Sequence, residues 1–255
     1  MDSNDYPPTN TDDWIQIGQE KKSGVLNVVK NSSDVADISV AWFKYRTTEE
    51  AGPIPANEFI SSKLGRLLNL PVAKIQFKEF AGHHGTLSFS VATEPYKWAQ
   101  FPYKSNLAAH IFNYDLLADI LVFDVFINNL DRNPDNLIYS KVSTTRNKYD
   151  LHLIDHGHCL LGPSQQPTPN DNFNFDQHIQ IPEFKELLTN GMDFFHDAIN
   201  RISNTVTEAE IDRIMSEIPE QYLNEEQKNH TKAMILYRKE KLYNEYETKC
   251  GGQRS

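Results

Sequence analysis

The sequence predicts an α+β protein with two lobes, a small antiparallel β lobe that includes one helix and a larger, mostly helical lobe. Short β-branched and aromatic runs separated by polar turns fill much of the first hundred residues, as antiparallel strands do. Most later segments have the apolar spacing and the capping residues typical of helices. We place the small lobe at 13–98 and the large lobe at 99–248, with a disordered lead-in at 1–12 and a tail at 249–255.

Composition describes an ordinary globular chain. Of its 255 residues, 39% are hydrophobic and 24% charged, so a large core can form. The net charge of −10 argues against general nucleic-acid binding, which needs a basic surface, and is compatible with a basic partner protein. We expect no membrane span and no secretory signal, and two cysteines do not make a disulfide framework. Cytoplasmic residence is the default expectation, and the oligomeric state stays open.

The small lobe is predicted to contain five strands and a helix. The strands are placed at 14–17, 25–29, 38–45, 73–80 and 87–91, with a turn at 82–85. The helix is placed at 56–68, after an extended linker at 53–55, and has Glu58 in its first turn, where the helix dipole favours an acid. Lys44 lies on the third strand between Phe43 and Tyr45. It needs a partner if it is buried, although alternation alone equally allows a solvent-facing lysine.

The large lobe is predicted to begin near Ser105, a plausible helix cap. One or two helices follow at 106–128, and then a hairpin of strands at 137–139 and 149–154 and a loop at 162–174. A helix is expected at 183–201, with a possible break at 190–191. The last two helices are placed at 207–218 and 224–247, capped by Thr207 and Asn224. Residues 121–127 are too apolar to face water on any side, so they are expected in the core.

Oxygen-bearing side chains are expected to converge at one end of the hairpin. In an antiparallel pair the start of the first strand lies beside the end of the second, so Asn136 should lie next to Asp155. Asp131, five residues before Asn136, belongs to the loop at the same end. Mg²⁺ prefers oxygen ligands and usually takes one or two carboxylates together with substrate phosphates. The stretch is therefore a candidate magnesium and nucleotide site.

This arrangement is the one that phosphoryl transfer uses. One Asp orients or deprotonates the attacking hydroxyl, an Asn five residues later holds a metal, and a second Asp after a strand holds the metal that bridges the nucleotide phosphates. Taken alone, the Asp131–Asn136 spacing also fits an ordinary polar turn. Its coupling to a hairpin that ends in Ile-Asp-His-Gly favours the functional interpretation.

These motifs resemble the catalytic core of the HipA-like kinases. The resemblance is carried by residues 123–136 and 153–157, by Asn57-Glu58 before the helix, and by the Asn-Leu-Pro-Val turn at 69–72. It runs from about residue 40 to 161, and the remaining third matches only as helical. The family implies a two-lobed, protein-kinase-like fold that uses ATP and Mg²⁺. Asn133 departs from the pattern, because related sequences commonly carry His there.

The resemblance also implies roles for individual residues. Asp131 would be the catalytic base, Asn136 and Asp155 would bind Mg²⁺, Lys44 would contact the nucleotide phosphates, Glu58 would position Lys44, and Arg132 would brace the loop. The glycine-rich nucleotide loop of protein kinases is missing. A turn with Ser32 and Ser33 precedes the lysine strand, and self-modification of a loop serine in the family makes these residues candidates for self-phosphorylation.

The predicted function is transfer of the γ-phosphoryl group of Mg·ATP to a hydroxyl, on Ser or Thr of a protein substrate. One alternative is a non-catalytic, pseudokinase-like module that binds a nucleotide or a partner. A second is a small-molecule kinase of the aminoglycoside type, with Asp171 and Asp176 binding a cationic substrate. A zinc site at His83–His84, or around His152 and His156, is a minor possibility.

Overall fold

The computed structural model describes residues 14–19, 24–30, 40–45, 53–92, 95–143, 147–162, 173, 175–178, 180–189 and 194–250. The predicted disordered lead-in at 1–12 and most of the predicted loop at 162–174 lie outside these residues. So does the tail beyond Cys250, whereas residues 249 and 250 belong to the last helix. Within the described part, no helix is long and apolar enough to cross a membrane.

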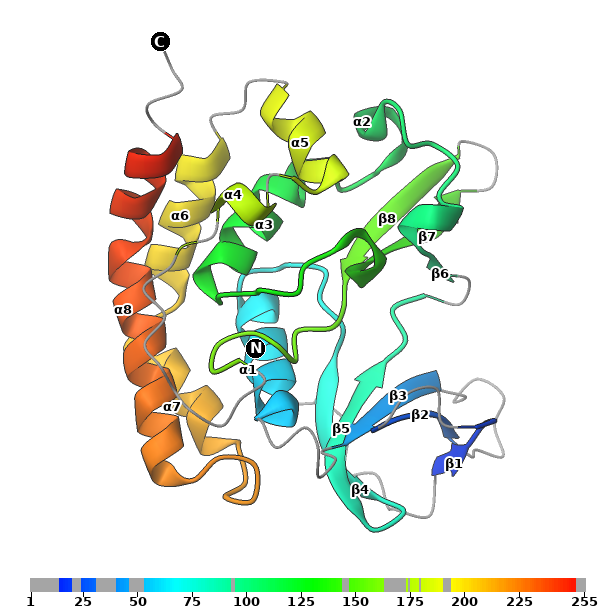
Figure 1. The fold of residues 1–255 in the computed structure, drawn as a ribbon, viewed down its shortest axis with the longest axis vertical. Coiled ribbons are helices and arrows are strands. Elements are labelled where there is room, and N and C mark those ends of the chain that lie inside the picture. Colours follow the sequence, from blue (N-terminus) through cyan, green and yellow to red (C-terminus); the bar gives the residue numbers. More distant parts are fainter. Residues whose placement is uncertain are drawn as a thin grey trace.

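The small lobe is an antiparallel sheet of strand order β1-β2-β3-β5-β4 (Figure 1). Its strands are β1 (Trp14–Gln16), β2 (Val25–Lys30), β3 (Val40–Tyr45), β4 (Ile75–Phe80) and β5 (His83–Phe89). The predicted turn at 82–85 is wrong in its extent. Ala81 and Gly82 make the turn with positive φ angles of 51° and 77°, so His83–Gly85 can continue the strand.

One face of this sheet covers a small core of its own. Trp14, Leu26 and Val28 pack there with residues of β3 and β5, including Phe43, which is fully buried. Side chains alternate between the two faces of a strand. Because Phe43 points into this core, Lys44 is placed on the opposite face of the sheet.

Helix α1 (Ile54–Leu67) begins two residues before the predicted start. The expected extended linker at 53–55 is therefore wrong for Ile54 and Pro55, because proline is tolerated in a first helical turn, where its missing N–H has no helical partner. Glu58 consequently lies in the second turn and not in the first. The helix packs against β4, β5 and helix α7 (Glu208–Ser216), and its apolar side chains belong to the large core.

The large lobe combines a second sheet with helices. The sheet has the order β6 (Pro95–Tyr96), β7 (Leu137–Ser143) and β8 (Lys148–Leu153). The helices are α2 (Leu107–His110), α3 (Leu117–Phe126), α4 (Phe175–His178), α5 (Pro182–Thr189), α6 (Phe194–Thr205), α7 (Glu208–Ser216) and α8 (Glu225–Cys250). This mixed architecture confirms the predicted α+β fold.

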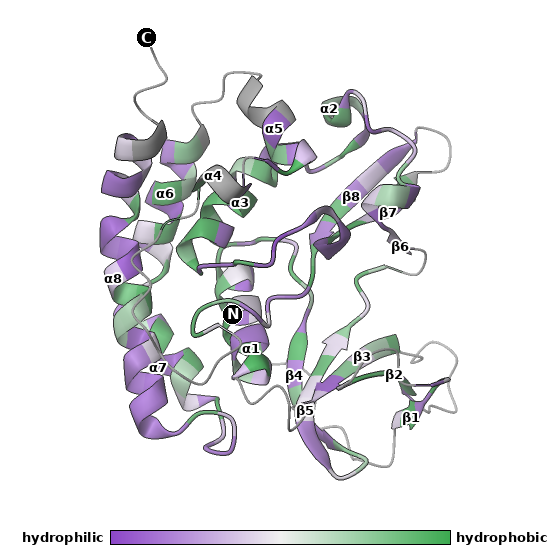
Figure 2. Cartoon of the chain, in the orientation of Figure 1, coloured by the Kyte–Doolittle hydropathy of each residue, from purple (hydrophilic) through white to green (hydrophobic). Residues whose placement is uncertain are grey.

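Helix α3 is the centre of the large core. Every one of its residues is buried, as its apolar sequence predicts, and Figure 2 shows it mostly hydrophobic while the outer helix α8 is largely hydrophilic. The buried Arg238 of α8 donates from Nε to the Phe126 carbonyl (2.8 Å) at the end of α3. A cation beside the exposed carbonyls of a helix C-terminus is favourable. Arg238 therefore fixes the point from which the next loop starts.

Two of the three predicted N-cap residues do cap a helix. Thr207 Oγ1 accepts from the Glu210 amide (3.2 Å), and Asn224 Oδ1 accepts from the Gln227 amide (2.9 Å). The expected Ser105 cap is wrong, because Asn106, with φ 62°, precedes α2 without a side-chain cap. The single-helix alternative for 106–128 is also wrong, since a short 3₁₀ turn at Tyr114–Leu116 separates α2 from α3.

Candidate active site

The β7–β8 hairpin positions two of the predicted site residues. The expected hairpin forms: Leu137 pairs with Leu153, and the Ile154 amide donates to the Asn136 carbonyl (3.2 Å). Asp155 therefore follows directly after the end of the hairpin, beside Asn136. Its backbone has φ 63°, a left-handed conformation that Asp tolerates better than most residues. The turn at Asp155 directs the chain away from the hairpin.

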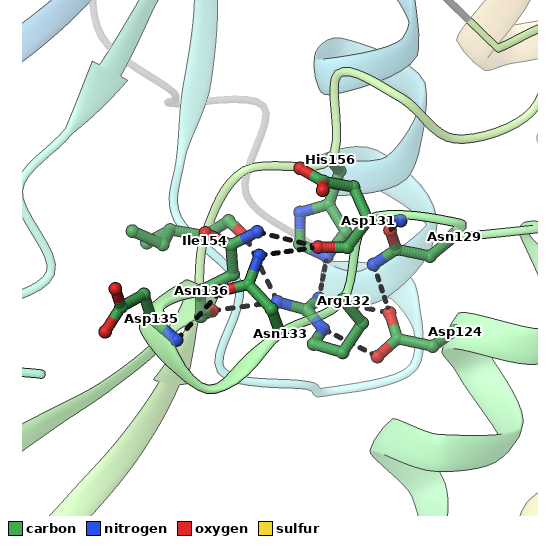
Figure 3. A network of polar contacts seen from close by, with 9 residues as sticks. All are labelled: Asp124, Asn129, Asp131, Arg132, Asn133, Asp135, Asn136, Ile154 and His156. Atoms are coloured by element: carbon green, nitrogen blue, oxygen red, sulfur yellow. Dashed lines mark hydrogen bonds and ion pairs between the residues drawn. The ribbon is translucent and has the colours of Figure 1, made fainter. Parts of the chain in front are cut away.

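The loop that carries Asp131 is held by its backbone and by asparagine side chains (Figure 3). The Asp131 carbonyl accepts from Asn133 Nδ2 (2.9 Å) and Asn136 Nδ2 (3.0 Å), and its amide donates to Asn129 Oδ1 (3.2 Å). The Asp131 carboxylate takes no part in these bonds; it points away from them in Figure 3, and the residue is exposed. The loop thus presents this carboxylate to solvent from a fixed backbone.

Arg132 ties this loop to the core. It is buried and makes a two-pronged ion pair with Asp124 of α3, with Nε–Oδ2 at 2.7 Å and Nη2–Oδ1 at 3.0 Å. Burial opposes ionisation of Asp124, but the guanidinium and its hydrogen bonds outweigh burial and lower the pKa of this carboxyl. Arg132 Nη1 also donates to the carbonyls of Asn136 (2.8 Å) and Ile154 (3.1 Å). One side chain therefore joins α3, the loop and the end of β8.

His156 completes the buried network as a neutral group. Its Nε2 lies 2.8 Å from Arg132 Nη2, a permanent donor, so this nitrogen accepts. Burial and the neighbouring Arg132 lower the pKa of His156 to about 3. The imidazole is consequently a structural acceptor that orients Arg132 and not a metal ligand.

Lys44 reaches the site from the small lobe. Its Nζ forms ion pairs with Glu58 of α1 and with Asp155 Oδ1 at 2.8 Å. The Lys44 side chain is 16% exposed, that of Glu58 only 1%, and that of Asp155 47%. Burial opposes the charge on Lys44, but the two carboxylates outweigh it and raise the pKa of the amine. A permanently charged lysine thus links the sheet, α1 and the residue after the hairpin.

The burial of Glu58 distinguishes this ion pair from an exposed one. An exposed ion pair contributes about 0–1 kcal/mol. Removing one partner of a buried pair instead leaves a desolvated charge without compensation.

We expect Lys44→Met to lower the free energy of unfolding by about 2–3 kcal/mol, because Glu58 must then stay unpaired or take up a proton. Glu58→Gln, which keeps the shape of the side chain, should cost less. Urea denaturation measures the free energy of unfolding of both variants. Lys241→Met, which changes a half-exposed lysine of α8, is the control. Equal midpoints for Lys44→Met and the control would show that the pair contributes nothing.

Asn57 anchors α1 to the chain after Asp155. Its Nδ2 donates to the carbonyls of Gly157 (2.8 Å) and Gly162 (3.3 Å). A Cβ on Gly157 would meet Ile54 Cγ2 at 2.7 Å, so only glycine lets the two segments approach this closely. The helix that carries Glu58 is therefore fixed to the segment that carries Asp155.

Ser32 and Ser33 lie outside the described residues, but the strands that flank them are placed. Val25 pairs with Lys44, whereas Val29 pairs with Val40 at the other end of the two strands. The connection at 31–39 is therefore attached at the end remote from Lys44. The β1–β2 connection is attached at the near end, where the Tyr45 amide donates to the Gly24 carbonyl (2.8 Å).

The residues proposed for Mg²⁺ have suitable donor chemistry. The Asn136 amide is oriented by its Nδ2 bond to the Asp131 carbonyl, which leaves Oδ1 as its ligand atom. Asp155 supplies a half-exposed carboxylate. Partial desolvation opposes its ionisation, but the ion pair with Lys44 outweighs this effect and lowers the pKa of Asp155. One carboxylate and one amide oxygen, completed by phosphates and water, suit this ion. These two residues therefore fit a nucleotide-bound Mg²⁺.

Other metal sites receive no support. His152 Nε2 bonds to Ser140 Oγ (2.8 Å), and His156 bonds to Arg132. Nowhere in the described ranges do three or more His, Cys, Asp or Glu residues gather as a metal group. Asp171 and the side chain of Asp176, suggested for a cationic substrate, lie outside the described atoms.

The sheet lobe, the helical lobe and the loop between them define a protein-kinase-like fold. The comparison with protein families agrees, since the model described as HipA-like kinase matches residues 42–249. The chain belongs to the HipA-like kinase family.

Solved structures with similar folds include kinases of distant sequence. The proinflammatory kinase CtkA of Helicobacter pylori matches with a TM-score of 0.63 and 14% identity over 92% of this chain and 93% of that one. HipA of Shewanella oneidensis MR-1, solved with HipB and operator DNA, gives a TM-score of 0.48 and 13% identity over 94% and 65% of the two chains. The Rio2 kinase of Chaetomium thermophilum gives 0.46 and 14% over 88% and 69%. No curated protein matches the sequence.

Sequence reasoning assigned no role in this site to Asp124, Asn129 or His156, although all three lie in the motifs that carry the family resemblance. Asp124 did leave a signal, because it is the one charged residue in the apolar run 121–127. A carboxylate in such a run needs a buried partner, and Arg132 follows eight residues later. His156 left no comparable signal, since a histidine after a strand is as compatible with a ligand as with a buried acceptor.

Proposed function

We propose that this protein is a kinase that transfers the γ-phosphoryl group of Mg·ATP to the hydroxyl of Ser or Thr in a protein. The observation that carries the proposal is the 2.8 Å contact between Lys44 of the sheet and Asp155 after the hairpin, beside a loop that presents Asp131. In phosphoryl transfer a lysine and a metal-binding Asp act on the same phosphates, while a second Asp receives the hydroxyl. Membership of the HipA-like kinase family supports this assignment.

Each residue has a defined task in this proposal. Lys44, held by Glu58, binds phosphate oxygens as a fixed cation. Asn136 and Asp155 would hold Mg²⁺, which would supply the positive charge that neutralises the phosphates. Asp131 accepts the proton of the attacking hydroxyl. Arg132 keeps the loop and the hairpin end in register.

The departure at Asn133 does not favour the pseudokinase alternative. Asn133 donates to the Asp131 carbonyl (2.9 Å), and its Oδ1 accepts from the Asp135 amide (2.9 Å). It therefore holds the loop on both sides of itself, which is the task expected of the residue at this position.

A protein acceptor with a basic surface suits the chain's net charge of −10.

Loss of the Asp155 charge should remove most of the Mg²⁺-dependent ATP binding. We choose Asp155→Asn because Asn also tolerates the left-handed backbone, so the change removes charge without strain. At ATP concentrations 100-fold above Kd, binding stabilises a protein by about 2.7 kcal/mol. We expect the wild type to show a corresponding rise in Tm with ATP and Mg²⁺, and the variant to lose most of it.

The control is Asp150→Asn on β8, the strand that precedes Asp155. It should keep the full rise in Tm, and an undiminished rise in Asp155→Asn would contradict the assigned role. Incubation with γ-labelled ATP, with basic model proteins and with aminoglycosides, identifies the acceptor. Labelled protein supports the proposal, and label only in the small molecule would overturn the substrate class.

A further inference from the structure

The turn between α7 and α8, at 217–224, reaches back to the small lobe. The Tyr222 hydroxyl donates to the Gly85 carbonyl (3.1 Å), and the Lys78 carbonyl is 3.4 Å away. The Tyr222 ring stacks on Phe77 of β4, with centroids 4.2 Å apart. Phe77 in turn stacks on Phe59 of α1, at 4.5 Å. Three stacked rings therefore connect the helical lobe, the sheet and α1.

These contacts lead to both members of the Lys44–Glu58 pair. Phe59 is the residue next to Glu58 in α1. Gly85 lies against the backbone of Lys44, so closely that a Cβ on Gly85 would be 2.2 Å from the Lys44 carbonyl oxygen. Tyr222 thus bonds to the segment that supports Lys44 and, through Phe77, packs toward the residue beside Glu58.

The turn has the rigidity that a brace requires. The Tyr222 amide donates to the Pro219 carbonyl (3.0 Å), and the next side chain, Leu223, is fully buried. Lys63 of α1 adds a second link to the same turn through Glu217, at 2.6 Å. Burial raises the pKa of Tyr222 to about 12, so the hydroxyl stays a donor at neutral pH. The two lobes are therefore joined by the 217–224 turn as well as by the Lys44–Asp155 contact in the site.

We propose that Tyr222 is a positioning residue, which holds α1 against the sheet so that Glu58 keeps Lys44 in place. Lys44 and Glu58 belong to separate elements, so contacts that hold α1 against the sheet help to keep the two side chains together. The proposal rests on the proposed function for its effect on turnover, whereas the bracing itself does not depend on catalysis. Positioning of this kind acts on the reacting geometry more than on overall affinity.

Two measurements on Tyr222→Ala and Tyr222→Phe test the proposal. Hydrogen exchange should rise about tenfold in the peptides of α1 in Tyr222→Ala, because local opening becomes easier. The kcat for phosphoryl transfer should fall about 10–100-fold with KM for ATP within about twofold. Tyr222→Phe keeps the ring stack and loses one hydrogen bond, so it should recover most of kcat. Tyr237→Ala, an equal truncation on the exposed face of α8, is the control and should match the wild type.

The two arms separate the possible failures. If the wild type neither binds nor transfers phosphate, the proposed function is wrong, and exchange in α1 still decides whether Tyr222 braces this helix. Wild-type exchange in α1 of Tyr222→Ala would overturn the proposal. So would a uniform rise in exchange across all helices, since it would mean general destabilisation.

Discussion

Replacing Asp131 with Asn is expected to reduce kcat for phosphoryl transfer by about 10²–10⁴-fold while leaving Mg·ATP binding unchanged. The structure explains why this substitution is selective. The bonds that hold the loop use the amide and the carbonyl of Asp131, and its side chain contributes to none of them. An Asn of equal size therefore keeps the backbone and removes only the group that can accept a proton.

The loop offers a matched control in Asp135. This residue is four positions later, is exposed like Asp131, and lies in the short 3₁₀ turn at Pro134–Asn136. Asp135→Asn makes the same chemical change in the same loop and should leave kcat within about twofold. Initial rates with γ-labelled ATP and Tm shifts with Mg·ATP measure both properties. Equal rates for the two variants and the wild type would make Asp131 an ordinary turn residue.

Features set by local chemistry were predictable from the sequence. The β7–β8 hairpin, the capped starts of α7 and α8 and the buried helix α3 depend on alternation, capping residues and an unbroken apolar run. The pairing at the hairpin end follows from the same pattern, because antiparallel pairing fixes which residues are neighbours. A backbone hydrogen bond accordingly joins Asn136 to Ile154, the residue before Asp155.

Features that depend on packing between distant segments were harder to predict. The burial of Glu58 comes from α1 lying against the Asp155 segment, which Asn57 and Gly157 secure across a hundred residues. The early start of α1 at Ile54 required recognising Pro55 as a first-turn proline. The attachment of the 31–39 connection to the strand ends away from Lys44 could, however, have been inferred, because Lys44 lies near the end of its strand and successive antiparallel connections alternate between the two ends of the strands.

Replacing Arg132 with Met is expected to have the largest effect on stability, lowering the free energy of unfolding by about 3–5 kcal/mol. Both charged side chains of the Arg132–Asp124 pair are fully buried, so Asp124 would keep a desolvated charge with no cation beside it. The carbonyls of Asn136 and Ile154 and the Nε2 atom of His156 would lose a donor as well. Leaving several buried acceptors without a hydrogen bond adds to the cost.

A double-mutant cycle separates the ion pair from the other bonds of Arg132. Asp124→Leu combined with Arg132→Met removes both charges, so the combined loss should be smaller than the sum of the single losses by at least about 1 kcal/mol. Arg213→Met, which breaks an exposed pair with Glu210 and Glu217, should cost about 0–1 kcal/mol. Urea denaturation gives all four values. Strict additivity, or an Arg132→Met loss no larger than that of Arg213→Met, would show that the buried pair does not hold the Asp131 loop to α3.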